Sequence, residues 1–182
     1  MSNILVIYGT TDGHTAKVAA FLGEHLRALG HTVEVDDAKE PRRNPMAADF
    51  DAVIVAASIH VSGYQQAVRR WVRDNLPPLS ERPNAFLSVC MGIVQATPRV
   101  RADLDAIVER FVAHTGWRPK RVEFVAGAIP YSRYGLFKRW VMQYMSRQAG
   151  VKTSPRQDYE YTDWEALRAF AGDSSGAIPA QR

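Results

Sequence analysis

Hydroxyl groups and glycine gather in a short stretch near the start of the chain, which contains Thr10, Thr11, Asp12, Gly13, His14 and Thr15. Residues 4–8 before it are apolar and largely β-branched, and the apolar positions after it recur at helical spacing. A loop between a strand and a helix directs backbone N–H groups and the positive end of the helix dipole to one point, and threonine hydroxyls add further donors. The stretch therefore predicts a cradle for an anion, most naturally a phosphate.

The loop differs from the two common nucleotide motifs. It lacks the lysine of a nucleoside triphosphate P-loop and the third glycine of a dinucleotide fingerprint. A hydroxyl-rich loop without a fixed cation suits a phosphomonoester that is held by hydrogen bonds alone. The alternative is an ordinary strand-to-helix turn that is capped by Asp12 or Thr11.

Two later loops carry groups that can grip a flat ring. The first follows a continuous apolar run at residues 51–57, and the second follows a strand expected at residues 84–90. The candidates in these loops are Ser58, Ile59, His60 and Tyr64, followed by Cys90, Met91 and Gly92. Backbone N–H groups beside Gly92 can approach a ring edge and stabilise negative charge there. His60 is the candidate for proton handling. Each side chain also has a structural alternative: a first helical turn for Tyr64, core packing for Met91 and Cys90, and a solvated loop position for His60.

Five strand-like runs alternate with helical patterns along the chain. Strands are expected at residues 4–8, 31–35, 51–57, 84–90 and 122–129, and helices at 15–30 with Gly30 as the cap, near 67–72 with a stop at Pro77 and Pro78, at 99–114 and at 162–171. This alternation predicts an α/β fold with a doubly wound, five-stranded parallel sheet. With strand order 2-1-3-4-5, the loops after strands one, three and four converge on one crevice. Residues 1–172 are expected to form one domain and residues 173–182 a disordered tail.

Composition fits a globular protein, with 182 residues, 46% hydrophobic and 23% charged. The single cysteine, Cys90, excludes an internal disulfide and a cysteine-based metal site, and no metal is expected. Redox chemistry would therefore need a cofactor. The N-terminus has no signal-peptide pattern and no apolar run approaches the ~18 residues that span a bilayer, so a cytoplasmic protein is expected.

Positive charge is concentrated in the last third of the chain. The net charge is +4, and residues 118–156 carry nine basic residues against Glu123 alone. Residues 131–148 have the pattern of a basic, aromatic, amphipathic helix inserted after strand five. Such a helix can lie in a membrane interface, where each cation contributes about 1 kcal/mol on anionic lipid; the alternative is a helix packed on the sheet. The candidate substrate or membrane contacts are Arg133, Lys138, Arg139 and Trp140.

The loop at residues 10–15 resembles the FMN loop of the flavodoxin family. Asp12 departs from the pattern, because electron-carrying flavodoxins usually place a hydroxyl there and a carboxylate is repelled by a phosphate dianion. Nearly the whole chain resembles, more narrowly, the quinone-dependent protoporphyrinogen dehydrogenases of bacterial haem synthesis. The residues that carry this resemblance are Thr11, Asp12, Gly13 and Thr15; Ala57, Ser58, Ile59 and Tyr64; Trp117, Arg118 and Pro119; Ala126, Gly127 and Ala128; Tyr131, Arg133 and Tyr134; and Tyr161, Thr162, Asp163, Trp164 and Glu165.

The resemblance implies FMN as cofactor, protoporphyrinogen IX as substrate and a membrane quinone as electron acceptor, at the cytoplasmic face of the inner membrane. Three other functions stay open: an electron-transfer flavodoxin, an NAD(P)H-dependent quinone reductase, and a nucleic-acid-binding module that uses the basic region. The pI of 9.4 disfavours the first, because electron-carrying flavodoxins are typically acidic. No nucleic-acid partner is expected.

Overall fold

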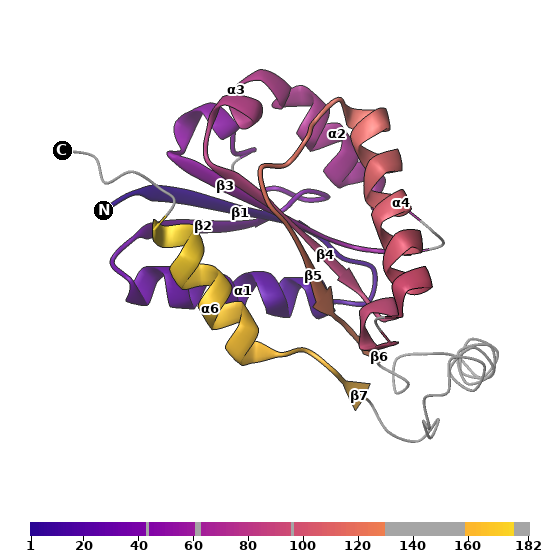
Figure 1. The fold of residues 1–182 in the computed structure, drawn as a ribbon. Coiled ribbons are helices and arrows are strands. Elements are labelled where there is room, and N and C mark those ends of the chain that lie inside the picture. Colours follow the sequence, from indigo (N-terminus) through magenta and orange to yellow (C-terminus); the bar gives the residue numbers. More distant parts are fainter. Residues whose placement is uncertain (43, 61–62, 96, 130–158, 177–182) are drawn as a thin grey trace.

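The computed structural model describes residues 1–42, 44–60, 63–95, 97–129 and 159–176. Its centre is a parallel five-stranded sheet in the order β2-β1-β3-β4-β5 (Figure 1). The strands are β1 (Asn3–Gly9), β2 (Thr32–Asp37), β3 (Ala52–Ser58), β4 (Asn84–Cys90) and β5 (Val122–Ala126). The helices are α1 (His14–Ala28), α2 (Gln66–Asp74), α3 (Leu76–Glu81), α4 (Pro98–Thr115) and α6 (Trp164–Gly176), with short 3-10 helices η1 (Ala47–Asp49) and η2 (Gly92–Gln95). The predicted fold class and strand order are confirmed.

Helices cover both faces of the sheet. The helices α1 and α6 lie on one face, and α2, α3 and α4 lie on the other (Figure 1). Because side chains alternate along a strand, Ile4 and Val6 of β1 pack in the layer with α1 and α6, whereas Leu5 and Ile7 pack in the opposite layer. A strand buried on both faces must be apolar at successive positions, which explains the continuous apolar runs in the sequence.

The carboxyl ends of the strands meet at one edge of the sheet. The register pairs Gly9 with Ala57, Ser58 with Val89, and Cys90 with Ala126. The loops after β1, β3 and β4 therefore leave the sheet side by side, as the predicted order requires.

The fifth strand is shorter than predicted. It ends at Ala126, and β6 (Ala128–Ile129) pairs antiparallel with β7 (Tyr159–Glu160) in a separate two-stranded sheet. This pairing joins residues 128–129 to residues 159–160. The predicted basic helix at 131–148 lies outside the described residues, as do Arg133, Lys138, Arg139 and Trp140.

Helix ends follow the local sequence signals with two differences. Gly30 has φ 90° and ends α1 as predicted. Pro77 and Pro78 follow α2 but also begin α3, because the first turn of a helix tolerates residues without an N–H. The last helix continues to Gly176, so the tail expected from residue 173 is helical up to there, and residues 177–182 lie outside the described part.

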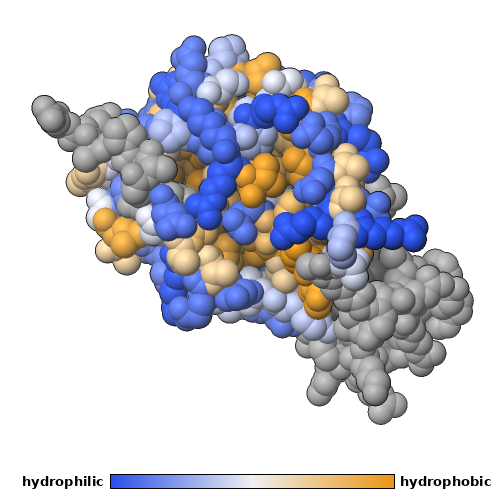
Figure 2. All heavy atoms as spheres, viewed as in Figure 1, coloured by the Kyte–Doolittle hydropathy of each residue, from blue (hydrophilic) through white to orange (hydrophobic). Residues whose placement is uncertain are grey.

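The strand β5 forms one edge of the sheet and is partly apolar on the side that faces α4. A hollow of about 390 Å³ lies between the two elements, and its lining includes Ile93, Val108, Val122 and Phe124. Figure 2 shows apolar surface near this edge. The strands β3 and β4 separate the hollow from the loop after β1. Among the described helices, none is long and apolar enough to cross a bilayer.

Candidate functional site

The first turn of α1 is built to leave backbone donors open. Gly13 occupies the N-cap position in the left-handed conformation, with φ 89°, and makes no side-chain cap hydrogen bond because it is a glycine. Its own N–H donates to Thr10 Oγ1 over 2.9 Å, and the first helical bond runs from the Lys17 N–H to the Gly13 carbonyl. The N–H groups of the intervening residues have no partner within the helix. The N-cap position itself is occupied by Gly13 rather than by Asp12 or Thr11.

Thr15 adds an unpaired hydroxyl to this turn. The residue is only 1% exposed, and its Oγ1 has no hydrogen-bond partner among the described residues. A buried polar group without a partner typically costs 1–3 kcal/mol. An anion bound at the helix N-terminus would supply the acceptor that this hydroxyl lacks. This orphaned donor is the feature of the structure that best fits the predicted phosphate cradle.

A side chain that the sequence analysis missed ties the first loop to the loop after β3. Gln65 Nε2 donates to Thr11 Oγ1 over 3.0 Å and to Ser58 Oγ over 2.7 Å, while Gln65 Oε1 is buried without a partner in the described structure. The Ile59 N–H also donates to the Val89 carbonyl, which joins this loop to the end of β4. A lone glutamine belongs to no motif, so only its place just before α2 could have drawn attention to it.

His60 and Tyr64, predicted to face a ring, differ in position. His60 is exposed, and its backbone forms two hydrogen bonds with the backbone of Gly63. Tyr64 is 5% exposed, and its ring packs edge-on against Phe86. Its hydroxyl bonds to Ser88 Oγ over 2.8 Å, and burial raises the pKa of the phenol. The prediction that the Tyr64 side chain grips a ring is therefore wrong in this structure, because the ring belongs to the core.

The loop after β4 presents mainly backbone. Cys90 is buried, and burial raises the pKa of its thiol, in keeping with its alternative as a small core residue. Met91 is half-buried, and Gly92 begins η2. Contact of Met91 and Gly92 with a ring stays a prediction.

Thr162, in the C-terminal part of the chain, contacts both the carboxyl end of β5 and the start of α1. The Thr162 hydroxyl donates to the Ala126 carbonyl over 2.7 Å, and His14 Nε2 lies 2.7 Å from Thr162 Oγ1. The Gly127 N–H in turn donates to the Cys90 carbonyl. Hydrogen bonds thus connect the ends of β4 and β5 to the first turn of α1.

The environment of His14 is set by burial and by two charged neighbours. Burial lowers the pKa of the imidazole; Glu160 opposes this shift, and Lys17 adds to it. Lys17 and Glu160 form an ion pair of 2.6 Å. In the described structure, the imidazole therefore favours its neutral form.

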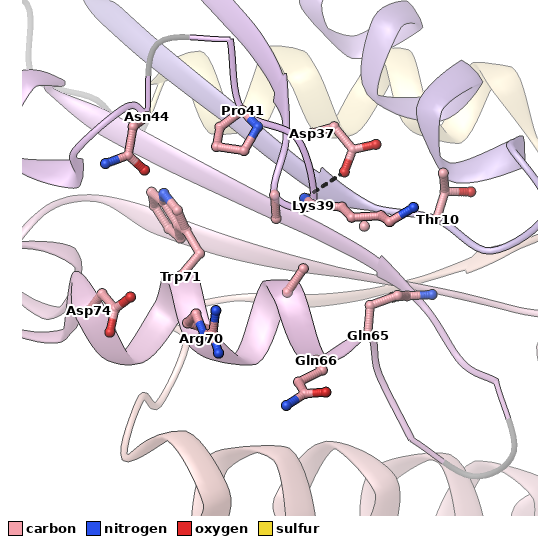
Figure 3. Close-up of a pocket in the computed structure, with 13 residues that line it drawn as sticks. Thr10, Asp37, Lys39, Pro41, Asn44, Gln65, Gln66, Arg70, Trp71 and Asp74 are labelled. Atoms are coloured by element: carbon pink, nitrogen blue, oxygen red, sulfur yellow. Dashed lines mark hydrogen bonds between the residues drawn. The ribbon is translucent and has the colours of Figure 1, made fainter.

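A hollow of about 540 Å³ lies beside the start of the first loop, between the segment after β2 and helix α2 (Figure 3). Lys39 lies close to Thr10 in this view, and Arg70 projects from α2. The Trp71 indole donates to the Pro45 carbonyl and fixes one part of the wall. The lining consists of Gly9, Thr10, Asp37, Ala38, Lys39, Pro41, Asn44, Gln65, Gln66, Ala67, Arg70, Trp71 and Asp74. This hollow could not be predicted from the sequence, because its walls come from segments far apart in the chain.

A family model for the flavodoxin domain matches residues 5–156. The chain belongs to the flavodoxin family. Within this family, it is 31% identical over 169 residues to the protoporphyrinogen IX dehydrogenase (quinone) of Escherichia coli, covering 92% of this chain and 91% of the relative. A protein of the same name from Leishmania major is 30% identical over 179 residues, covering 96% of this chain and 75% of that protein.

Solved structures support the flavodoxin fold. Oxidised flavodoxin 1 from Bacillus cereus superposes with a TM-score of 0.57 at 14% identity, covering 98% of this chain and all of that one. At this identity the likeness concerns the fold alone.

Proposed function

We propose that this chain binds FMN without a covalent link and oxidises protoporphyrinogen IX to protoporphyrin IX, with a membrane quinone as electron acceptor, in haem biosynthesis. The observation that carries the proposal is the match, over 92% of the chain, to a relative named for this reaction. The unpaired Thr15 hydroxyl and the glycine at the N-cap of α1 support the cofactor part of the proposal.

The first turn of α1 would hold the FMN phosphate. The Thr15 hydroxyl and the open N–H groups of the turn would donate to its oxygens, and the helix dipole would favour its negative charge. Gly13 is needed because its φ of 89° lets the chain enter the helix without a side-chain cap. Asp12 stays a candidate for the loop through its backbone rather than its carboxylate.

The loops after β3 and β4 would hold the ring. Ser58, Ile59 and His60 would lie on one side, and Met91 and Gly92 on the other. Gln65 fixes the distance between the phosphate loop and the first of these loops through Thr11 and Ser58. The chain's part is thus to position the cofactor and to exclude water, whereas FMN, when bound, supplies the two-electron redox chemistry.

The overall reaction balances with three quinones. Protoporphyrinogen IX loses six electrons and six protons in three two-electron steps, and three quinones become three quinols. His60 is the proposed proton-handling residue, and its exposed position suits exchange with solvent. We assign no other acid or base.

Peripheral association with the cytoplasmic face of the inner membrane belongs to the same proposal. Residues 131–148 would contact the membrane. Within them, the candidates for contacts with lipid phosphates or substrate propionates are Arg133, Lys138, Arg139 and Trp140.

The test is an anaerobic assay with the purified protein reconstituted with FMN. Protoporphyrinogen IX and a menaquinone analogue are added, and porphyrin fluorescence is followed, with FMN or quinone omitted in parallel reactions. Porphyrin formation that needs both supports the proposal. Flavin binding without porphyrin formation would overturn the substrate assignment and favour an electron carrier or an NAD(P)H-dependent quinone reductase. A cofactor-free protein that retains nucleic acid in a salt-sensitive manner would favour the third alternative.

A further inference from the structure

Residues 160–164, which we call the C-terminal contact segment, pack against the first two turns of α1. The Glu160 carboxylate accepts from Lys17 Nζ over 2.6 Å and from the Trp164 indole over 2.8 Å. The Lys17 ammonium also lies 5.1 Å from the centre of the Trp164 ring. The segment thus contacts the same helix end that would hold the FMN phosphate.

Thr162 connects this helix end to the end of β5. Its hydroxyl proton is donated to the Ala126 carbonyl, so Thr162 Oγ1 can only accept from His14. His14 therefore carries its proton on Nε2, and its ring orientation is fixed by a residue 148 positions away. Because His14 is the first residue of α1, fixing its ring also fixes the first turn of the helix, which contains Thr15.

We propose that Thr162 is a positioning residue for the FMN phosphate, acting through His14, so that phosphate affinity depends on docking of the C-terminal contact segment. This inference rests on the FMN binding proposed above, but not on the identity of the substrate. Because coupling between two equilibria is reciprocal, bound FMN should in turn hold the segment on α1. The segment begins at Glu160, which pairs with Ala128, so this coupling extends to the strand pair β6–β7.

The decisive comparison is between FMN and riboflavin, which lacks the phosphate. Thr162→Val keeps the shape of the side chain but removes both hydrogen bonds. We expect FMN to bind about tenfold more weakly, since the loss of one to two net hydrogen bonds corresponds to about a tenfold change in affinity. The affinity for riboflavin should change by less than about twofold. Thr162→Ser keeps the hydroxyl and should restore the FMN-to-riboflavin affinity ratio of the wild type.

Thr97→Val is the matched control. The Thr97 hydroxyl accepts from the Val100 N–H at the start of α4, on the opposite face of the sheet from α1. Its loss should leave the FMN-to-riboflavin ratio unchanged. Equal weakening of FMN and riboflavin by Thr162→Val, or no weakening of either, would overturn the inference and leave the proposed function intact.

Amide hydrogen exchange on the unmodified protein tests the same coupling without relying on a variant that folds. Adding FMN should slow exchange in residues 160–164 and leave residues 97–101 at the start of α4 unchanged. Unchanged exchange in residues 160–164 at saturating FMN would contradict the coupling. A wild-type protein that binds no FMN would overturn the inference together with the cofactor part of the proposed function.

Discussion

Replacing Thr15 by valine should stabilise the cofactor-free protein while it weakens FMN binding. The side chain is 1% exposed and Oγ1 has no partner among the described residues, so the wild type carries an unpaired buried hydroxyl. Valine has nearly the same shape, and its helix propensity is similar to that of threonine. An unsatisfied buried hydroxyl costs about 1–3 kcal/mol, so Thr15→Val should raise the free energy of unfolding without FMN by about 1 kcal/mol or more.

The same substitution removes a donor to a charged ligand. Hydrogen bonds to charged groups contribute about 1.5–3 kcal/mol, which corresponds to roughly 10- to 150-fold weaker FMN binding. Denaturant unfolding without FMN measures the first effect, and quenching of flavin fluorescence on titration with protein measures the second. The two effects have opposite signs, which distinguishes a ligand-binding hydroxyl from a merely structural one.

Thr115→Val is the matched control for Thr15→Val. Thr115 is also buried, at 3% exposed, but its hydroxyl donates to the Phe111 carbonyl and accepts from the Trp117 N–H. This variant should lose about 1–3 kcal/mol of stability and keep its FMN affinity. If Thr15→Val destabilised the cofactor-free protein by more than about 1 kcal/mol, or left FMN affinity unchanged, the assignment of Thr15 to the phosphate would be refuted.

Three further substitutions test separate parts of the account. Gly13→Ala should lower the free energy of unfolding by about 1–2 kcal/mol, because Gly13 has φ 89°, and it should weaken FMN binding. Thermal unfolding and flavin titration measure the two effects, and an unchanged melting temperature would contradict the prediction. Tyr64→Phe leaves the Ser88 hydroxyl without its partner and should lower stability by about 1 kcal/mol, whereas a large loss of FMN affinity would return Tyr64 to the binding site. Burial lowers the pKa of His14 below its ordinary 6.5, so the folded state resists protonation and stability falls as the pH drops from about 6.5 towards the folded-state pKa. His14→Asn should therefore reduce the dependence of the melting temperature on pH in this range. A pH dependence equal to that of the wild type would show that His14 is not its source.

The sheet could be predicted because its strands are simple in sequence. Residues 52–57 are apolar at successive positions, which is typical of a strand covered by helices on two sides. The end of β5 was harder to predict, because residues 122–129 form one strand-like run that the structure divides between two sheets at Gly127. What divides it is pairing of Ala128 and Ile129 with a segment near the end of the chain, which no local pattern reveals.

Site residues could be predicted from the sequence where the order of strand, loop and helix sets their position. They were missed where contacts between side chains far apart in the sequence set it. Gly13 and Thr15 follow a strand and open a helix, so their place at the sheet edge is readable from sequence order. The position of Tyr64 was mispredicted because a tyrosine beside a loop fits a binding face and a core position equally well, and its partner Ser88 lies far away in sequence, on β4. Gln65 contacts Thr11 across 54 positions, and such contacts exist only once the chain has folded.

The most direct test of the central claim is an anaerobic two-stage experiment on the FMN-loaded protein. Protoporphyrinogen IX is added first, and a menaquinone analogue second, while flavin absorbance and porphyrin fluorescence are recorded together. The account predicts that the absorbance of oxidised flavin disappears as porphyrin appears, and that it returns when the quinone is added. Flavin that stays oxidised with protoporphyrinogen IX but is reduced by NADH or NADPH would contradict the claim.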